Sequence, residues 1–330
     1  SPAELLRALA PLQNSGTVLA VHMRQEGAEV VAACREMIAL ARALQIPVEI
    51  SHLKCIGRSG WGKSVPEMLR LLAQARAEGL DLSCDVYPYP AGSTQLIHIL
   101  PPECHLGGAE LLTERLGDPR ECEKIKQRMR SVTDFENISL LVGFENIHCS
   151  SLPQHPEWEG KSIAEIARLR GEDEFGCLFS LLREEHCNIT MIDFIAAEED
   201  IEAILREESS VLISDSTYPT EGTPHPRVYG AATRLLEHYT KERGVLSLPQ
   251  AIHKLTRRSA DRFSLTQKGR IELGADADIN IFAPENIHEN ASYENPRRTS
   301  SGMDYVLVGG EIVLENGKRT AAAPGKFLRR

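Results

Sequence analysis

Two short apolar runs near the start of the chain each end at a histidine. The first, 18–21 (Val-Leu-Ala-Val), precedes His22, and the second, 48–51 (Val-Glu-Ile-Ser), precedes His52. Between them apolar residues recur at a spacing of three to four, which predicts a helix between two strands; these residues are Val31, Cys34, Met37, Ile38, Ala41 and Leu44. The strands of such a unit run parallel, so both imidazoles should lie at the same carboxyl-terminal edge of one sheet. Two imidazoles at one edge suggest a metal site.

The same alternation continues after His52. Ser64 can cap a following helix. The further elements that the pattern predicts are a strand over 80–87, a strand over 189–193, an acidic helix near 198–207, a strand over 211–214 and a helix over 248–263. The strand over 211–214 ends at Asp215. Alternating strands and helices of this kind predict an α/β fold with a parallel sheet.

Residues 92–188 interrupt this rhythm. We expect an apolar strand over 138–142 and a helix near 163–169 within this segment. Long excursions from the edge of an α/β sheet are commonly lids or substrate loops, so we predict a lid insertion here. Beyond the last helix, period-two alternation with glycine turns predicts an antiparallel sheet. We therefore expect a larger α/β domain over 1–265 and a small β domain over 266–330.

The composition excludes some classes of partner. A net charge of -10 argues against binding nucleic acid through a general basic field, although a local cationic pocket could still capture a small anion. No apolar run approaches the roughly 18 residues of a membrane helix, and no basic-then-apolar signal pattern begins the chain, so we expect a cytoplasmic protein without a membrane partner. The eight cysteines form no CxxC pair, and we expect most of them to be reduced thiols in the core.

One motif favours a different function. Residues 57–64 (Gly-Arg-Ser-Gly-Trp-Gly-Lys-Ser) satisfy the phosphate-loop pattern GxxxxGK[ST] between a predicted strand and a predicted helix. Against this interpretation, Trp61 stands where backbone amides should surround a phosphate, and His52 and Lys54 place polar groups at the end of the strand. A P-loop nucleotide-binding protein therefore remains an alternative, which calorimetry with ATP and magnesium on the wild type and Lys63→Ala would test.

The wider set of motifs resembles the D-aminoacylase family, the N-acyl-D-amino-acid deacylases of the amidohydrolase superfamily. The motifs stand in the family's order and span nearly the whole chain: His22-Met-Arg-Gln-Glu26, Ser51-His-Leu-Lys-Cys55 with Gly60-Trp-Gly-Lys-Ser64, Asp85-Val-Tyr-Pro-Tyr89 with Ala91-Gly-Ser-Thr94, Ser214-Asp215, Pro224-His-Pro-Arg227, and Gly269-Arg-Ile with Gly274-Ala-Asp-Ala-Asp278. The resemblance implies that the chain is the carboxyl-terminal part of a metal-dependent-hydrolase (β/α)₈ TIM-like barrel, with a lid and a small β domain. It also accounts for the Gly-Trp-Gly-Lys loop without a nucleotide.

The resemblance implies a role for six residues. His22 and His52 would be ligands of a zinc ion, which accepts neutral imidazoles well. Asp215 matches the family's catalytic carboxylate, which takes a proton from the metal-bound water that attacks the amide and returns it to the leaving amine. The positions that hold the substrate's α-carboxylate in similar enzymes are matched by Lys54, Tyr87 and Arg227. The implied reaction is zinc-dependent hydrolysis of N-acyl-D-amino acids to a carboxylate and a D-amino acid.

Each of these residues also has an ordinary structural interpretation. A single histidine after a strand is more often a hydrogen-bonded core group than a ligand, although two on neighbouring parallel strands favour ligation. Asp215 could cap the segment that follows it. Tyr87 could be a packing aromatic, and Lys54 and Arg227 could be solvated surface charges.

The family's His-x-His motif of the first barrel strand and the cysteine ligand of the second have no counterpart here. No His-x-His occurs in the sequence, and only the residues 1–21 precede His22. We therefore expect the chain to supply the later barrel strands only. Either the missing part was removed, a second chain supplies it, or the gene product is truncated. A homo-oligomer is a further expectation for the partners, and a noncatalytic remnant that binds a partner is an alternative function. A cyclic amidohydrolase of the dihydroorotase or hydantoinase type is a further alternative.

Two imidazoles are fewer than the three or four protein ligands of a tight zinc site. We predict that this polypeptide alone binds zinc weakly and hydrolyses N-acyl-D-amino acids slowly or not at all. Equilibrium dialysis against zinc, combined with a turnover assay on an N-acetyl-D-amino acid, measures both properties. Rapid turnover by the isolated chain with one tightly held zinc would contradict the prediction.

Overall fold

A four-stranded parallel sheet organises the amino-terminal half of the chain. The computed structural model describes residues 1–131 and 134–328, so the predicted lid and the predicted β domain each include two residues outside the described part. The sheet has the order β1-β2-β3-β7, and its strands are β1 (Leu19–Val21), β2 (Val48–Ile50), β3 (Leu82–Val86) and β7 (Val211–Leu212). Val21 is aligned with Ile50, and Ile50 with Cys84. β1 and β2 therefore end level with one another, and β3 continues for two more residues to Val86.

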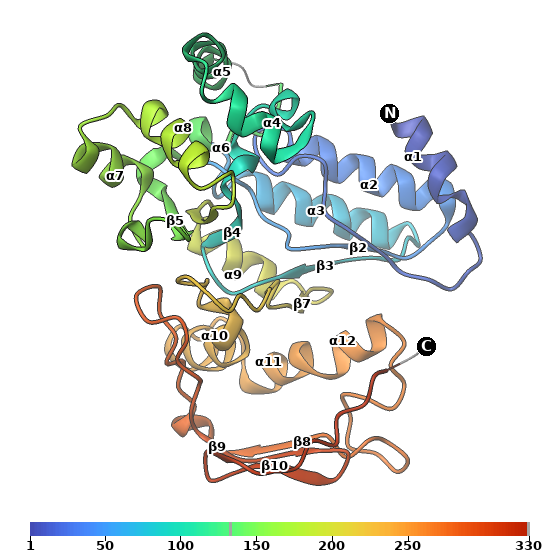
Figure 1. Cartoon of the computed structure of the whole chain (residues 1–330). Coiled ribbons are helices and arrows are strands. Elements are labelled where there is room, and N and C mark those ends of the chain that lie inside the picture. Colours follow the sequence, from blue (N-terminus) through green and yellow to red (C-terminus); the bar gives the residue numbers. More distant parts are fainter. Residues whose placement is uncertain (132–133, 329–330) are drawn as a thin grey trace.

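Amphipathic helices cover this sheet. α2 (Val30–Leu44) joins β1 to β2, α3 (Ser64–Ala77) joins β2 to β3, and α9 (Glu198–Arg206) precedes β7. The residues of the predicted apolar stripe of α2 from Cys34 to Leu44 are buried. Val31, which precedes them in the stripe, is partly exposed. α1 (Pro2–Leu9) begins at a capping box formed by Ser1 and Glu4 and packs along α2 (Figure 1).

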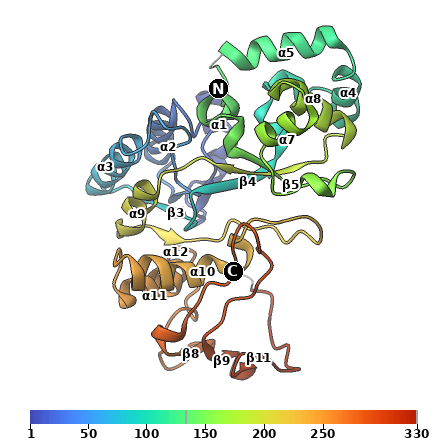
Figure 2. The same cartoon turned by 90° about the vertical axis from the view of Figure 1, so that its left-hand side faces the viewer.

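The predicted lid is a layer with its own core. Its strands β4 (Ala91–Gln95), β5 (Ile147–Ser151) and β6 (Thr190–Phe194) form an antiparallel sheet of order β4-β6-β5. Five helices surround this sheet: α4 (Gly108–Arg115), α5 (Pro119–Ser131), α6 (Ile138–Val142), α7 (Ile163–Arg170) and α8 (Glu174–Glu184). Figure 2 shows this layer beside the α2 and α3 layer, with β4 running between them.

Two predicted strands in this region are corrected. Residues 138–142 form the helix α6 rather than a strand, because a short apolar run fits a buried helix as well as a buried strand. The Asn137 side chain caps this helix by accepting from the Leu140 amide. Residues 190–194 do form a strand, but β6 pairs antiparallel with β4 and β5 instead of joining the parallel sheet.

The carboxyl-terminal part continues with helices and ends in a second antiparallel sheet. α10 (Arg227–Arg234) runs into a π-helix (Leu235–Glu242), followed by α11 (Leu248–Leu255) and α12 (Arg257–Arg262). The sheet has the order β11-β10-β9-β8 and consists of β8 (Ile279–Phe282), β9 (Met303–Val308), β10 (Glu311–Glu315) and β11 (Lys318–Arg319). In both views α10 to α12 lie between the parallel sheet and these strands (Figures 1 and 2). Short 3-10 helices cover Ala10–Leu12, Leu96–Ile99, Pro102–His105, Phe144–Asn146, Pro156–Trp158 and Pro284–Asn286.

Two further expectations for this part need correction. The single helix predicted over 248–263 is interrupted at Thr256, whose backbone leaves the helical region with φ -130° and ψ -91°. The alternating pattern that begins at Gly269 yields a strand only from Ile279, and the residues before it form turns and irregular segments. A glycine-rich segment with charged side chains can form its backbone hydrogen bonds within turns, so it does not need a partner strand.

Other expectations are met in the described residues. All eight cysteines are free, and seven of them are buried. No helix in the described ranges is long and apolar enough to cross a membrane. The fold is α/β, but its parallel sheet has four strands within the described residues, and a closed (β/α)₈ barrel is not formed there. That the sheet is part of such a barrel, and that a domain boundary lies near 265, stay predictions.

Core packing under the parallel sheet is open to a direct test. Leu72 on α3 is completely buried, whereas Leu273 is fully exposed. We predict that Leu72→Ala lowers the free energy of unfolding by about 2–5 kcal/mol, since it removes buried methyl groups and leaves a cavity. Leu273→Ala should change it by less than about 0.5 kcal/mol. Urea unfolding followed by circular dichroism measures both, and equal effects would contradict this description of the core.

Candidate metal and substrate site

The two predicted histidines meet at the carboxyl-terminal edge of the parallel sheet. His22 directly follows β1 and His52 lies two residues beyond β2, and Nδ1 of His22 is 3.0 Å from Nε2 of His52. The backbone of His52 has φ +39°, a left-handed conformation that costs a non-glycine residue about 1–3 kcal/mol. The surrounding structure fixes this conformation, because the His52 amide donates to the Asp85 carboxylate and the Leu53 amide donates to the Asp85 carbonyl.

Glu26 is the group that organises this pair, and sequence reasoning gave it no role. Its side chain is 4% exposed and lies 2.7 Å from Nζ of Lys54 and 3.0 Å from Nδ1 of His52. Burial favours the neutral form, but the Lys54 charge and the hydrogen bond and charge of His52 outweigh it and lower the pKa of Glu26 to about 2. Glu26 is therefore ionised at neutral pH and accepts a hydrogen bond from Lys54, and it can also accept one from Nδ1 of His52 when that nitrogen carries the proton.

The donor set fits a zinc ion in chemistry. Ligand atoms of His22, Glu26 and His52 all lie within 4.8 Å of one another. If Nδ1 of His52 donates its proton to Glu26, the Nε2 lone pair that faces His22 is free to bind a metal, and a carboxylate in this position is the usual partner of a zinc-binding imidazole. Burial lowers the pKa of His22, with the Glu26 charge opposing this effect, so His22 can supply a neutral imidazole.

A second cluster contains Asp215, Arg227 and Tyr87. Asp215 follows β7, has φ +50° and is 37% exposed, and its Oδ2 lies 3.0 Å from Nη1 of the buried Arg227. The Arg227 guanidinium lies 4.7 Å above the centre of the Tyr87 ring. Asp215 acts on the pKa of His22 through its charge. The structure thus brings the predicted base and two predicted substrate contacts together, near enough to His22 for the Asp215 charge to act on that imidazole.

Lys54 belongs to the histidine cluster rather than to an open surface. Its side chain is 11% exposed, and Nζ lies 2.8 Å from Nδ1 of His52 and 3.2 Å from the His52 carbonyl oxygen. Its predicted contact with a substrate carboxylate would therefore compete with the ion pair that it forms with Glu26. The assignment of Lys54 as a substrate contact stays a prediction.

Two more buried acids lie in this region and were missed. Burial raises the pKa of Asp85 to about 7, although the hydrogen bond from the His52 amide opposes the shift. Burial also raises the pKa of Asp193 to about 6 against the charges of Lys54 and Arg227. Asp85 stands near the end of the third parallel strand, so the rule that identified His22 and His52 could have found it. Asp193 comes from β6, whose antiparallel pairing the sequence did not reveal.

The phosphate-loop motif is folded in a way that leaves no phosphate cradle. The Gly62 amide donates to the Asp200 carboxylate at 3.1 Å, and the Lys63 and Ser64 amides both donate to the Gly60 carbonyl. A phosphate site needs these N–H groups free and an absence of negative charge. Here the Asp200 carboxylate accepts the hydrogen bond of the Gly62 amide and brings a negative charge to the loop. Both features argue against the nucleotide-binding alternative.

The segment between β8 and β9 reaches the site from the carboxyl-terminal sheet. Glu289 accepts a hydrogen bond from the Tyr89 hydroxyl, and the Tyr293 ring lies 5.3 Å from that of His225. Arg297 donates to the carbonyls of the loop after Asp215, at Pro219, Glu221 and Gly222. The carboxyl-terminal part therefore supports the walls of the site.

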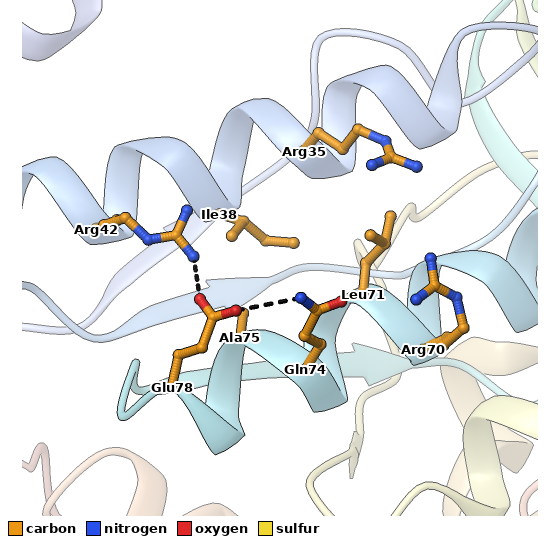
Figure 3. Close-up of a pocket in the computed structure, with 8 residues that line it drawn as sticks. All are labelled: Arg35, Ile38, Arg42, Arg70, Leu71, Gln74, Ala75 and Glu78. Carbon is orange, nitrogen blue, oxygen red and sulfur yellow. Dashed lines mark hydrogen bonds and ion pairs between the residues drawn. The ribbon is translucent and has the colours of Figure 1, made fainter.

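Two cavities adjoin the second cluster. One has a volume of about 220 Å³ and is lined by Arg227, His225 and hydroxyl side chains. The other has a volume of about 310 Å³ and shares Ser150 with the first. A further cavity of about 340 Å³ lies between α2 and α3, where Arg42 and Gln74 contact Glu78 (Figure 3). None of the predicted site residues lines this cavity.

Comparison with known proteins identifies the family. Residues 125–314 match the model of the amidohydrolase family. The chain belongs to the amidohydrolase family. This amidohydrolase chain is 30% identical to D-aminoacylase of Alcaligenes xylosoxydans xylosoxydans over 99% of its own length and 58% of the relative. It is also 30% identical to N-acyl-D-glutamate deacylase of the same organism over 96% of the chain and 55% of the relative.

The fold of the chain also matches that of a solved deacylase structure. N-acyl-D-glutamate deacylase from Bordetella bronchiseptica, complexed with zinc and a phosphonate that mimics the tetrahedral intermediate, superposes with a TM-score of 0.76 at 26% identity. The match covers 95% of this amidohydrolase chain and 56% of the deacylase. The chain therefore spans a little over half the length of the relatives that it matches.

The position of Glu26 generates a test that does not depend on activity. We predict that Glu26→Gln weakens zinc binding about 10- to 100-fold, the usual effect of removing a carboxylate that orients a metal-binding imidazole. Competition with a chromophoric zinc chelator measures the dissociation constant. Glu29→Gln, a change at an exposed position three residues away, is the matched control. Equal zinc affinity of the wild type and both variants would contradict the role of Glu26.

Proposed function

We propose that this chain carries the later metal ligands and the substrate-binding residues of a zinc-dependent deacylase that hydrolyses N-acyl-D-amino acids. The observation that carries the proposal is the pair of imidazoles 3.0 Å apart, faced by Asp215 in an ion pair with Arg227. Relatives named as D-aminoacylase and N-acyl-D-glutamate deacylase support the substrate class. The zinc in a related deacylase supports the metal.

In this proposal His22 and His52 hold the zinc, and Glu26 keeps the proton of His52 on Nδ1. Bound zinc would polarise the substrate carbonyl and activate the attacking water. Asp215 takes the proton of that water and returns it to the nitrogen of the leaving D-amino acid. Asp215 lies in the loop after β7, and its 37% exposed side chain supports a role in which it reaches the substrate.

Arg227 and Tyr87 hold the substrate in this proposal. Arg227 has five N–H donors, of which Nη1 faces Asp215 and Nη2 donates to the Ser93 carbonyl at 3.4 Å. Its planar fork can bind the α-carboxylate of the substrate while it orients the base. Lys54 adds positive charge near the same point. The guanidinium rests on the buried Tyr87 ring, which limits its movement.

The substrate class and the base are tested together on the native protein, with any segment or subunit that accompanies this chain. We predict hydrolysis of N-acetyl-D-alanine, with no comparable rate for N-acetyl-L-alanine, hydantoin or dihydrouracil. Asp215→Asn should lower kcat about 10²- to 10⁴-fold, since it removes the general base. Release of the free amino acid is measured by chromatography.

Asp276→Asn, which alters an exposed carboxylate in the carboxyl-terminal part, should leave kcat unchanged. Faster hydrolysis of the cyclic substrates would support a cyclic amidohydrolase in place of the deacylase. Binding of N-acetyl-D-alanine without any turnover would support a noncatalytic remnant. Full activity of Asp215→Asn would remove Asp215 from the mechanism.

A further inference from the structure

Relatives with different names are about equally similar to the chain: N-acyl-D-glutamate deacylase and D-aminoacylase are each 30% identical to it, and N-acyl-D-aspartate deacylase is 28% identical. Overall identity therefore does not decide which side chain the substrate carries. The cavities next to Asp215 and Arg227 can decide it, because their lining groups must pair with whatever the substrate buries there.

Hydroxyl groups dominate the cavity beside Asp215. Its hydroxyl-bearing residues come from β4, β5, β6 and the loop after β7, and they are Ser93, Ser150, Ser151, Thr190, Ser216, Thr217 and Thr220. A hydroxyl both donates and accepts, so it pairs with an amide or another hydroxyl without any charge. The volume of about 220 Å³ is below the roughly 300–1,000 Å³ of sites for drug-sized ligands, which suits a short side chain.

The cavity offers no cation for a second carboxylate. Arg227 is the one lysine or arginine among the residues that line it, and it already faces Asp215. His225 is buried, accepts from the Arg227 amide through Nδ1 and contacts the Ala91 carbonyl through Nε2. Burial and the Arg227 charge hold the pKa of His225 well below its usual value. The imidazole therefore stays neutral and its two nitrogens are occupied.

The other charged side chains that line the two cavities, apart from Arg227 and the histidines, are acidic. Glu221 lines the cavity beside Asp215, and Glu159 and Glu294 line the adjoining one. The adjoining cavity is otherwise lined by neutral side chains and His148, among the residues that the structure describes. A glutamate or aspartate side chain would lose its hydration there without gaining a cationic partner, which is costly for a buried charge.

We propose that the cavity beside Asp215 selects N-acyl-D-amino acids with neutral hydrogen-bonding side chains, of the glutamine, asparagine or serine type, and excludes those with acidic side chains. The inference rests on the proposed function and names its substrate class. Hydroxyls of the wall pair with the carboxamide or hydroxyl, and Glu221 accepts from a carboxamide N–H group. Arg227 is kept for the α-carboxylate that every substrate shares.

Binding of an isosteric pair of ligands tests this proposal without requiring turnover. N-acetyl-D-glutamine and N-acetyl-D-glutamate differ by one amide in place of one carboxylate, and calorimetry on the zinc-loaded native protein gives their dissociation constants. We expect glutamine to bind at least about 10-fold more tightly. Glu221→Lys should reduce this ratio to about one or reverse it, because it exchanges an exposed carboxylate of the cavity for a cation.

Glu311→Lys is the matched control, since it changes the net charge equally at an exposed position on β10, and it should leave the ratio unchanged. Equal or tighter binding of N-acetyl-D-glutamate by the wild type would overturn the inference while the proposed function stands. An equal effect of both lysine variants would also overturn it. If N-acetyl-D-alanine and both test ligands all fail to bind, the proposed function itself is wrong, and the inference falls with it.

Discussion

The buried ion pair between Glu26 and Lys54 is the interaction on which the proposed metal site depends. Both side chains lie at the carboxyl-terminal edge of the sheet, almost without access to solvent, and a carboxylate buried there without a partner would cost several kcal/mol. With Lys54 beside it, Glu26 stays ionised and lies 3.0 Å from Nδ1 of His52. That contact directs Nε2 of His52 toward His22. The residues thus form one network, in which a change at any member alters the others.

The parallel sheet positions the residues of this network. Because β1, β2 and β3 are parallel neighbours in register, the polar residues at their carboxyl-terminal ends gather at one edge. The Asp85 carboxylate at the end of β3 binds the backbone of His52 and holds it in a left-handed conformation. Strain of this kind is common where a side chain must be aimed at a ligand. The cost is offset by the buried apolar core under α2 and α3.

The walls of the site come from three separate parts of the chain. The antiparallel sheet of the lid contributes Ser93 and Ser150, the loop after β7 contributes Asp215 and Glu221, and the segment between β8 and β9 secures that loop through Arg297. The proposed metal ligands and the walls of the cavity therefore come from different elements. A family whose members share the metal edge can change the substrate side chain by altering the lid and loops alone.

The sequence by itself determined the features that depend on near neighbours along the chain. Periodicity placed α2, α3 and the parallel strands, and those strands placed His22 and His52 at one edge. The motifs identified the family. The roles of His22, His52, Asp215 and the other site residues stay predictions. Only the tertiary structure decided that 138–142 form a helix, that β6 joins the lid sheet, and that Glu26 contacts His52. Each of these depends on contacts between segments that are far apart in the chain. The local pattern of hydrophobic residues does not determine which distant surface a segment packs against.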